Sequence, residues 1–102
     1  METILEHPER DEIRIEAVLQ ALADPVRLKI VKDLADAPAG IACGALDVPI
    51  SKSTRTHHIR TLREAGVVHV RAEGTCRIST LRRADLDALY PGLLDGVLAA
   101  ER

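Results

Sequence analysis

The sequence predicts a single, mainly helical domain with one β-hairpin, in the order helix, helix, short helix, helix, hairpin, helix. Apolar residues recur at helical spacing towards both ends of the chain, and the period changes to alternation on either side of Gly74. The chain also contains one Tyr and no Phe or Trp, so its core must consist of aliphatic side chains, which favours packed helices. A length of 102 residues suffices for one domain spanning the whole chain, but not for two.

Two helices and a short third segment are predicted in the first half. The first helix spans residues 9 to 22, because acidic residues fill its first turn and apolar residues line one face. Asp24 and Pro25 then provide the N-cap and the first position of a second helix. Residues 41 to 47 predict a short helix of about two turns at most, which Pro49 ends.

The next helix spans residues 52 to 65. Ser51 or Ser53 can cap its first turn, and Gly66 provides its C-terminal stop. This helix and the short segment before it are joined by a tight turn, as in a helix-turn-helix.

Two further elements complete the fold. The alternating segments VVHVR and CRISTL flank Gly74, which can adopt the positive φ of a hairpin turn. Helical spacing resumes at Ala84, and Pro91 is expected to kink or restart this last helix.

The charges are unevenly distributed along the chain. The net charge is −2 overall, but residues 51 to 83 carry eight Lys and Arg against two Asp and Glu. The segments before and after this basic block are acidic. A basic block that coincides with the helix and the hairpin favours contact with phosphates, although clustered solvated charges produce the same pattern without a partner.

The predicted helices and hairpin resemble those of the ArsR/SmtB family of bacterial winged helix-turn-helix regulators. The segments ALADPVRLKIVKDL and SKSTRTHHIRTLREAGVV carry the resemblance, which covers residues 15 to 83 with the hairpin. Thr56, His58 and Ile59 match the family's recognition helix, in which a small hydroxyl residue is followed by His and an apolar residue. The resemblance implies a homodimer paired through its first and last helices, with recognition helices in successive major grooves and wings on the flanking backbone.

The chain departs from the family pattern in two places. The link between Leu46 and Ser51 is short, which predicts truncation of the first helix of the DNA-reading pair. Arg55 stands where the family has an apolar residue, so it either reaches DNA or lies at the edge of the core.

The predicted contacts with double-stranded DNA lie on the recognition helix and the wing. A helix N-terminus offers N–H groups to phosphate, and its first turns fit a major groove about 12 Å wide. An ordinary solvated helix face is the alternative, and Glu73 at the hairpin tip would repel phosphate. The predicted contact residues are Lys52, Ser53, Thr54, Arg55, His57, His58, Arg60, Arg71, Thr75 and Arg77.

The apolar stripe of the last helix either closes the core or meets a second copy. We expect a two-fold dimer, with interface residues Ile15, Val18, Leu19, Leu22, Leu89, Tyr90, Leu93, Leu94 and Val97. The predicted function is a transcriptional regulator, specifically a repressor that binds an inverted-repeat operator as a homodimer. A winged protein-interaction module that does not read DNA is the alternative.

No metal, cofactor or catalytic site is predicted. His57 and His58 point about 100° apart on a helix and cannot readily share an ion, and the last helix offers only carboxylates. The sequence contains no enzyme signature such as G-x-S-x-G or HExxH. Cys43 and Cys76 are expected to be reduced thiols, and regulation through one of them is an alternative. The absence of a long apolar run and of an export signal predicts a cytoplasmic protein without membrane contact, whose effector is unknown.

Overall fold

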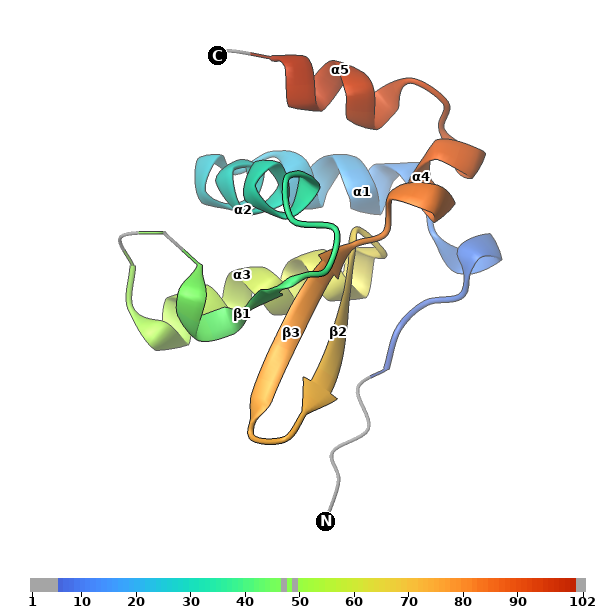
Figure 1. Cartoon of the computed structure of the whole chain (residues 1–102). Helices are drawn as coiled ribbons and strands as arrows, with labels where there is room; N and C mark the ends of the chain where they lie inside the picture. The colour runs from blue at the N-terminus through green and yellow to red at the C-terminus, as the bar shows by residue number, and fades with distance from the viewer. Residues whose placement is uncertain (1–5, 47, 49, 101–102) are drawn as a thin grey trace.

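The computed structural model describes residues 6–46, 48 and 50–100. Helix α5 lies above α1 and α2, these lie above α3, and the hairpin β2–β3 extends below the helices (Figure 1). The elements in chain order are a 3₁₀ turn (Arg10–Glu12), α1 (Ile15–Leu22), α2 (Pro25–Ala35), β1 (Ile41–Ala42), a 3₁₀ turn (Cys43–Ala45), α3 (Lys52–Ala65), β2 (Val68–Glu73), β3 (Cys76–Leu81), α4 (Arg83–Leu89) and α5 (Leu93–Ala99). This order confirms the predicted winged helix-turn-helix class.

The start of the first helix differs from the prediction. Residues 9 to 22 do not form one helix, because α1 begins at Ile15. Glu9 and Glu12 close a separate 3₁₀ turn through reciprocal side-chain to backbone hydrogen bonds. The backbone is then extended at Ile13, whose side chain is buried in the core. The acidic first turn therefore belongs to a separate element that positions Ile13.

The second helix begins as predicted. The Asp24 carboxylate accepts hydrogen bonds from the N–H groups of Val26 at 2.8 Å and Arg27 at 3.1 Å, and Pro25 is the first helical residue. These two bonds lower the pKa of Asp24, the bond from Arg27 having the larger effect. The cap fixes the start of α2, which packs against α1 and α3.

The predicted α3 and hairpin are also confirmed. Ser51 caps α3, and Gly66 ends it in the left-handed conformation at φ +87°. Strands β2 and β3 are antiparallel, with Val70 opposite Ser79, and a two-residue turn connects them at Gly74, where φ is +63°. The end of α3 at Gly66 and the turn at Gly74 thus determine where the hairpin lies relative to α3.

The prediction of about two helical turns after Gly40 is wrong for the part of residues 41 to 47 that the structure describes. Ile41 and Ala42 form the short strand β1, which pairs with β3, and a single 3₁₀ turn follows. At Gly40 φ is +98°, and an added Cβ would lie 2.9 Å from the Ser79 carbonyl oxygen. The chain reverses closely against β3 here, which favours a third strand over a helix.

The first helix of the predicted DNA-reading pair is thus reduced to one 3₁₀ turn, in line with the truncation expected from the short link before α3. Asp47 and Pro49, which belong to that link, lie outside the described residues.

The predicted restart of the last helix is confirmed. Helix α4 ends at Leu89 and α5 begins at Leu93, and Gly92 between them has φ +86°. Among the residues that the structure describes, the buried side chains are aliphatic apart from Ser79. None of the described helices is long and apolar enough to span a membrane.

Candidate nucleic-acid interface

The N-terminal turn of α3 presents short polar side chains at the surface. Ser51 Oγ accepts a hydrogen bond from Thr54 N–H at 3.3 Å and lies 2.9 Å from Thr54 Oγ1, to which it can donate. The side chains of Lys52, Ser53 and Thr54 are exposed. The predicted contacts at this helix end therefore surround backbone N–H groups that suit an anion.

The two adjacent histidines occupy different environments. His57 is exposed, as is Arg60 one turn further along α3. His58 is half-buried, and its Nδ1 lies 3.1 Å from Arg27 Nη1. Because a guanidinium can only donate, His58 Nδ1 is the acceptor. Arg27 also donates to the Ala21 carbonyl at 2.6 Å, so His58 is tied to the α1–α2 corner. His57 is therefore the outward histidine, and His58 is the partly buried, hydrogen-bonded one.

Arg55 lies at the border between surface and core. Its side chain is half-buried and lines a hollow between α3 and the hairpin. Lys52, Arg60 and Arg77 line the same hollow. Arg63 lines the same hollow and donates to the Glu6 carbonyl oxygen at 2.6 Å. Arg63 is not among the contacts predicted from the sequence, although helical spacing of three residues places it in line with Arg60.

The wing is less cationic at its edge than its sequence suggests. Arg71 Nε forms an ion pair with Glu73 at 3.2 Å, and Arg71 Nη2 donates to the Ala39 carbonyl oxygen at 3.2 Å. Thr75 and Arg77, which follow the turn, are exposed. Among the predicted wing contacts, Thr75 and Arg77 are therefore the better placed, since Arg71 would have to leave two partners.

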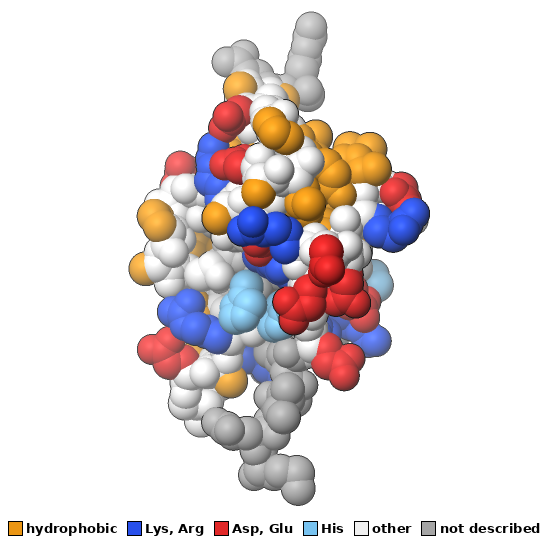
Figure 2. Space-filling view, turned by 90° about the vertical axis from the view of Figure 1, so that its right-hand side faces the viewer, with side chains coloured by type: hydrophobic (Ala, Val, Ile, Leu, Met, Phe, Trp, Pro, Cys, Tyr) orange, Lys and Arg blue, Asp and Glu red, His pale blue; other side chains and the backbone are white. Residues whose placement is uncertain are grey.

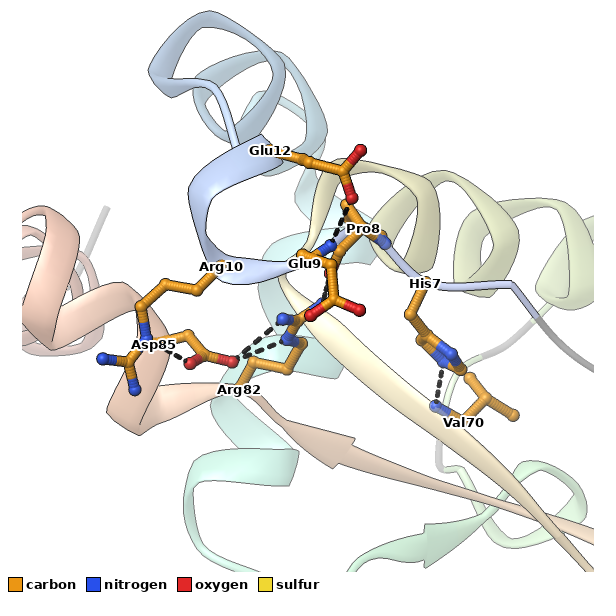
Figure 3. A network of polar contacts seen from close by, with 8 residues as sticks. All are labelled: His7, Pro8, Glu9, Arg10, Glu12, Val70, Arg82 and Asp85. Atoms are coloured by element: carbon orange, nitrogen blue, oxygen red, sulfur yellow. Dashed lines mark hydrogen bonds and ion pairs between the residues drawn. The ribbon is translucent and has the colours of Figure 1, made fainter.

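A polar network holds the segment before α1 against the base of the wing (Figure 3). Asp85 accepts from Arg10 at 2.7 Å and from Arg82 at 2.9 Å, and Arg82 also donates to the Pro8 carbonyl at 2.7 Å. The bond with Arg10 and then the bond with Arg82 hold the pKa of Asp85 below its usual value. This network links α4 to the residues that precede the first helix.

The same segment reaches the outer edge of the hairpin (Figure 3). His7 Nε2 accepts a hydrogen bond from the Val70 N–H at 3.0 Å, and the His7 ring stacks on His69 with 4.2 Å between centroids. This contact is not predictable from the sequence, because no local pattern relates His7 to a strand 63 residues later.

The predicted dimer residues fall into two groups. Val18, Leu22 and Leu94 are buried within the protomer, whereas Ile15 and Leu19 are 38% and 49% exposed. The remaining predicted residues, Leu89, Tyr90, Leu93 and Val97, are half-buried. Figure 2 shows hydrophobic side chains gathered at the level of α1 and α5, with charged and histidine side chains below them.

No group of three or more His, Cys, Asp or Glu side chains that could hold a metal occurs among the described residues. The carboxylates of the last two helices form ion pairs, Asp85 with Arg82 and Asp95 with Arg83. Cys76 is exposed at the start of β3, whereas the side chain of Cys43 lies outside the described part.

Comparisons with known proteins agree with this geometry. The family described as "Helix-turn-helix domain" matches residues 22–71. The chain is 32% identical over 87 residues to YceK of Bacillus subtilis, an uncharacterized HTH-type transcriptional regulator, covering 83% of this chain and 86% of the relative. It is 36% identical over 84 residues to the HTH-type transcriptional regulator Rv2034 of Mycobacterium tuberculosis, covering 76% and 78%.

A solved structure gives the same fold. The crystal structure of the ArsR family transcriptional regulator RHA00566 superposes with a TM-score of 0.68 at 20% identity, covering 80% of this chain and 90% of that one. The relatives and the fold are those of DNA-binding regulators and not of enzymes. The chain therefore belongs to the HTH-type transcriptional regulators, and its fold is the winged helix-turn-helix fold of an ArsR family regulator.

Proposed function

We propose that the chain represses transcription in the bacterial cytoplasm by binding an inverted-repeat operator as a homodimer, with residues 1–102 acting as one winged domain. The observation that carries this proposal is the outward face of α3. Lys52, Ser53, Thr54, His57 and Arg60 are all exposed there, and no other described element packs over them. A cationic, hydroxyl-bearing helix face next to a hairpin suits the major groove and its flanking phosphates.

The proposed dimer forms through α1 and α5. Ile15 and Leu19 are the exposed large hydrophobic residues of the described chain, and both lie on α1. The half-buried Leu93 and Val97 on α5 can extend this surface, whereas the buried members of the predicted interface contribute to the protomer core. A two-fold axis at this surface would present two α3 helices to half-sites about 34 Å apart, and an occupied operator would block RNA polymerase.

Selection of bound fragments from a random duplex pool tests the proposal, because the operator need not be known beforehand. We expect an inverted repeat to be recovered. The Lys52→Ala/Arg60→Ala variant should bind it much more weakly while remaining dimeric, because both cations face outward from α3. Lys29→Ala/Lys32→Ala is the matched control, since it removes the same charge from α2.

Two results would contradict the proposal. Recovery of no enriched sequence would favour a winged protein-interaction module. Equal loss of binding in the control variant would mean that net charge, rather than the α3 face, accounts for the affinity.

A further inference from the structure

The hollow between α3 and the hairpin is large enough for a small molecule. Its volume is 760 Å³, within the range of about 300–1,000 Å³ typical of ligand pockets. Residues from β1 and the 3₁₀ turn after it, from α3, from β2 and from the start of β3 line it. The hollow therefore lies on the face that the proposed function assigns to DNA.

The lining combines two kinds of surface. Ala42, Ala45, Ile59 and Val70 form an apolar part, in which Ile59 and Val70 belong to the core. Five cations also line it, namely Lys52, Arg55, Arg60, Arg63 and Arg77, and the remaining lining residues are Gly44, Thr56, Thr75 and Cys76. No acidic side chain occurs among the described lining residues.

These two parts specify the chemistry of a ligand. Five cations in a concave site raise the local concentration of anions, and guanidinium groups suit carboxylates in particular. A phosphate backbone would use the cations but would leave the apolar part without a partner. An apolar ring or chain that bears a carboxylate would use both.

We propose that this hollow binds a small amphipathic anion, an apolar body with a carboxylate, and that its occupancy excludes DNA. The exclusion rests on the proposed function, because Lys52, Arg60 and Arg77 would serve both ligands. Such an anion acts as an inducer without a conformational change, since it occupies the DNA-reading face itself. The ligand site alone does not depend on DNA binding.

Cys76 provides a direct reporter, because this exposed residue lines the hollow. The rate of Cys76 alkylation by iodoacetamide is measured in a Cys43→Ser chain, with 2-naphthoate as the probe. At a probe concentration about ten times its Kd, the rate should fall about tenfold, because about one site in ten remains empty. The neutral 2-naphthamide and inorganic phosphate test the apolar and anionic parts separately, and neither should protect Cys76. Equal protection by phosphate, or by the amide, would overturn the proposal.

Two variants test whether the probe protects Cys76 by binding in the hollow. Ala45→Phe places a ring in the hollow and should abolish protection, whereas Ala88→Phe, at an exposed position of α4, should retain it. Arg63→Gln removes one lining cation and should weaken protection several-fold, which provides a second test if Ala45→Phe does not fold. Unchanged protection in both lining variants would refute the site.

The DNA consequence is tested with the selected operator. Addition of 2-naphthoate should release the wild-type protein from it, whereas release of Arg63→Gln should need a several-fold higher concentration of the probe. If Cys76 is protected while no operator can be selected, the ligand site stands and the proposed function falls. If an operator is bound but Cys76 is not protected, the ligand site falls and the proposed function stands.

Discussion

Replacing Gly66 with Ala should destabilise the protein by about 2–5 kcal/mol. Gly66 ends α3 at φ +87°, where a residue with a side chain costs about 1–2 kcal/mol. An added Cβ would also lie 2.5 Å from Ile13 Cγ1 and 3.3 Å from Ile13 Cγ2. Because both branches of this buried side chain are involved, rotation about χ1 cannot relieve the clash, and overpacking adds about 1–3 kcal/mol.

Urea unfolding at a single protein concentration, followed by circular dichroism, measures this change. Three other glycines separate the two contributions. Gly74→Ala and Gly92→Ala carry only the conformational cost of about 1–2 kcal/mol, because φ is positive but no atom lies within 4 Å of the added Cβ. Gly96→Ala has neither cost and should stabilise α5 by about 0.5–1 kcal/mol. If Gly66→Ala were no more destabilising than Gly92→Ala, the argument from contact with Ile13 would be refuted.

Three further predictions concern DNA binding and acid stability. In a dimer the Lys52→Ala/Arg60→Ala variant removes four cations, so the slope of the logarithm of the operator association constant against log salt should become shallower by about 3.6, compared with about 1.8 for a monomer. Fluorescence anisotropy of a labelled operator measures this slope. An unchanged slope would exclude phosphate contact by these residues. Asp24→Ala should lower the unfolding free energy by about 1 kcal/mol in urea titrations through loss of the α2 cap, whereas Asp24→Asn should retain most of it, and equal losses would contradict the capping role. Because two arginines lower the pKa of Asp85, the ionised carboxylate stabilises the folded protein fully at neutral pH, and this stabilisation is lost as the pH falls below about 4. Asp85→Asn should therefore lower the free energy of unfolding by about 1 kcal/mol near pH 7 and by less near pH 3. A decrease that does not depend on pH would argue against the ion pairs.

The sequence predicted those elements whose ends are determined locally. Asp24 followed by Pro25, Ser51 before a helical stretch and Gly66 after it act within three residues of themselves, so their effect can be recognised without a fold. Strand β1 could not be predicted in this way. Its two residues are strand only because β3 lies alongside, and β3 is more than 30 residues away.

The candidate site divides along the same line. Exposure of His57 and burial of His58 follow from helical spacing around Ile59, and both were predictable. The hydrogen bond from Arg71 to Ala39 was not, because Ala39 comes next to Arg71 only when β1 folds against β3. The sequence did not determine whether Arg55 reaches DNA or lies at the edge of the core. Arg55 is half-buried because it lines the hollow between α3 and the hairpin.

The contact between His7 and Val70 has a consequence for handling the protein. β2 is an outer strand of the three-stranded sheet, and such strands are templates for aggregation through intermolecular β-pairing. The imidazole occupies the Val70 N–H that an incoming strand would need. Removal of His7 would free this N–H and lengthen the part of β2 that can pair with a strand of another molecule.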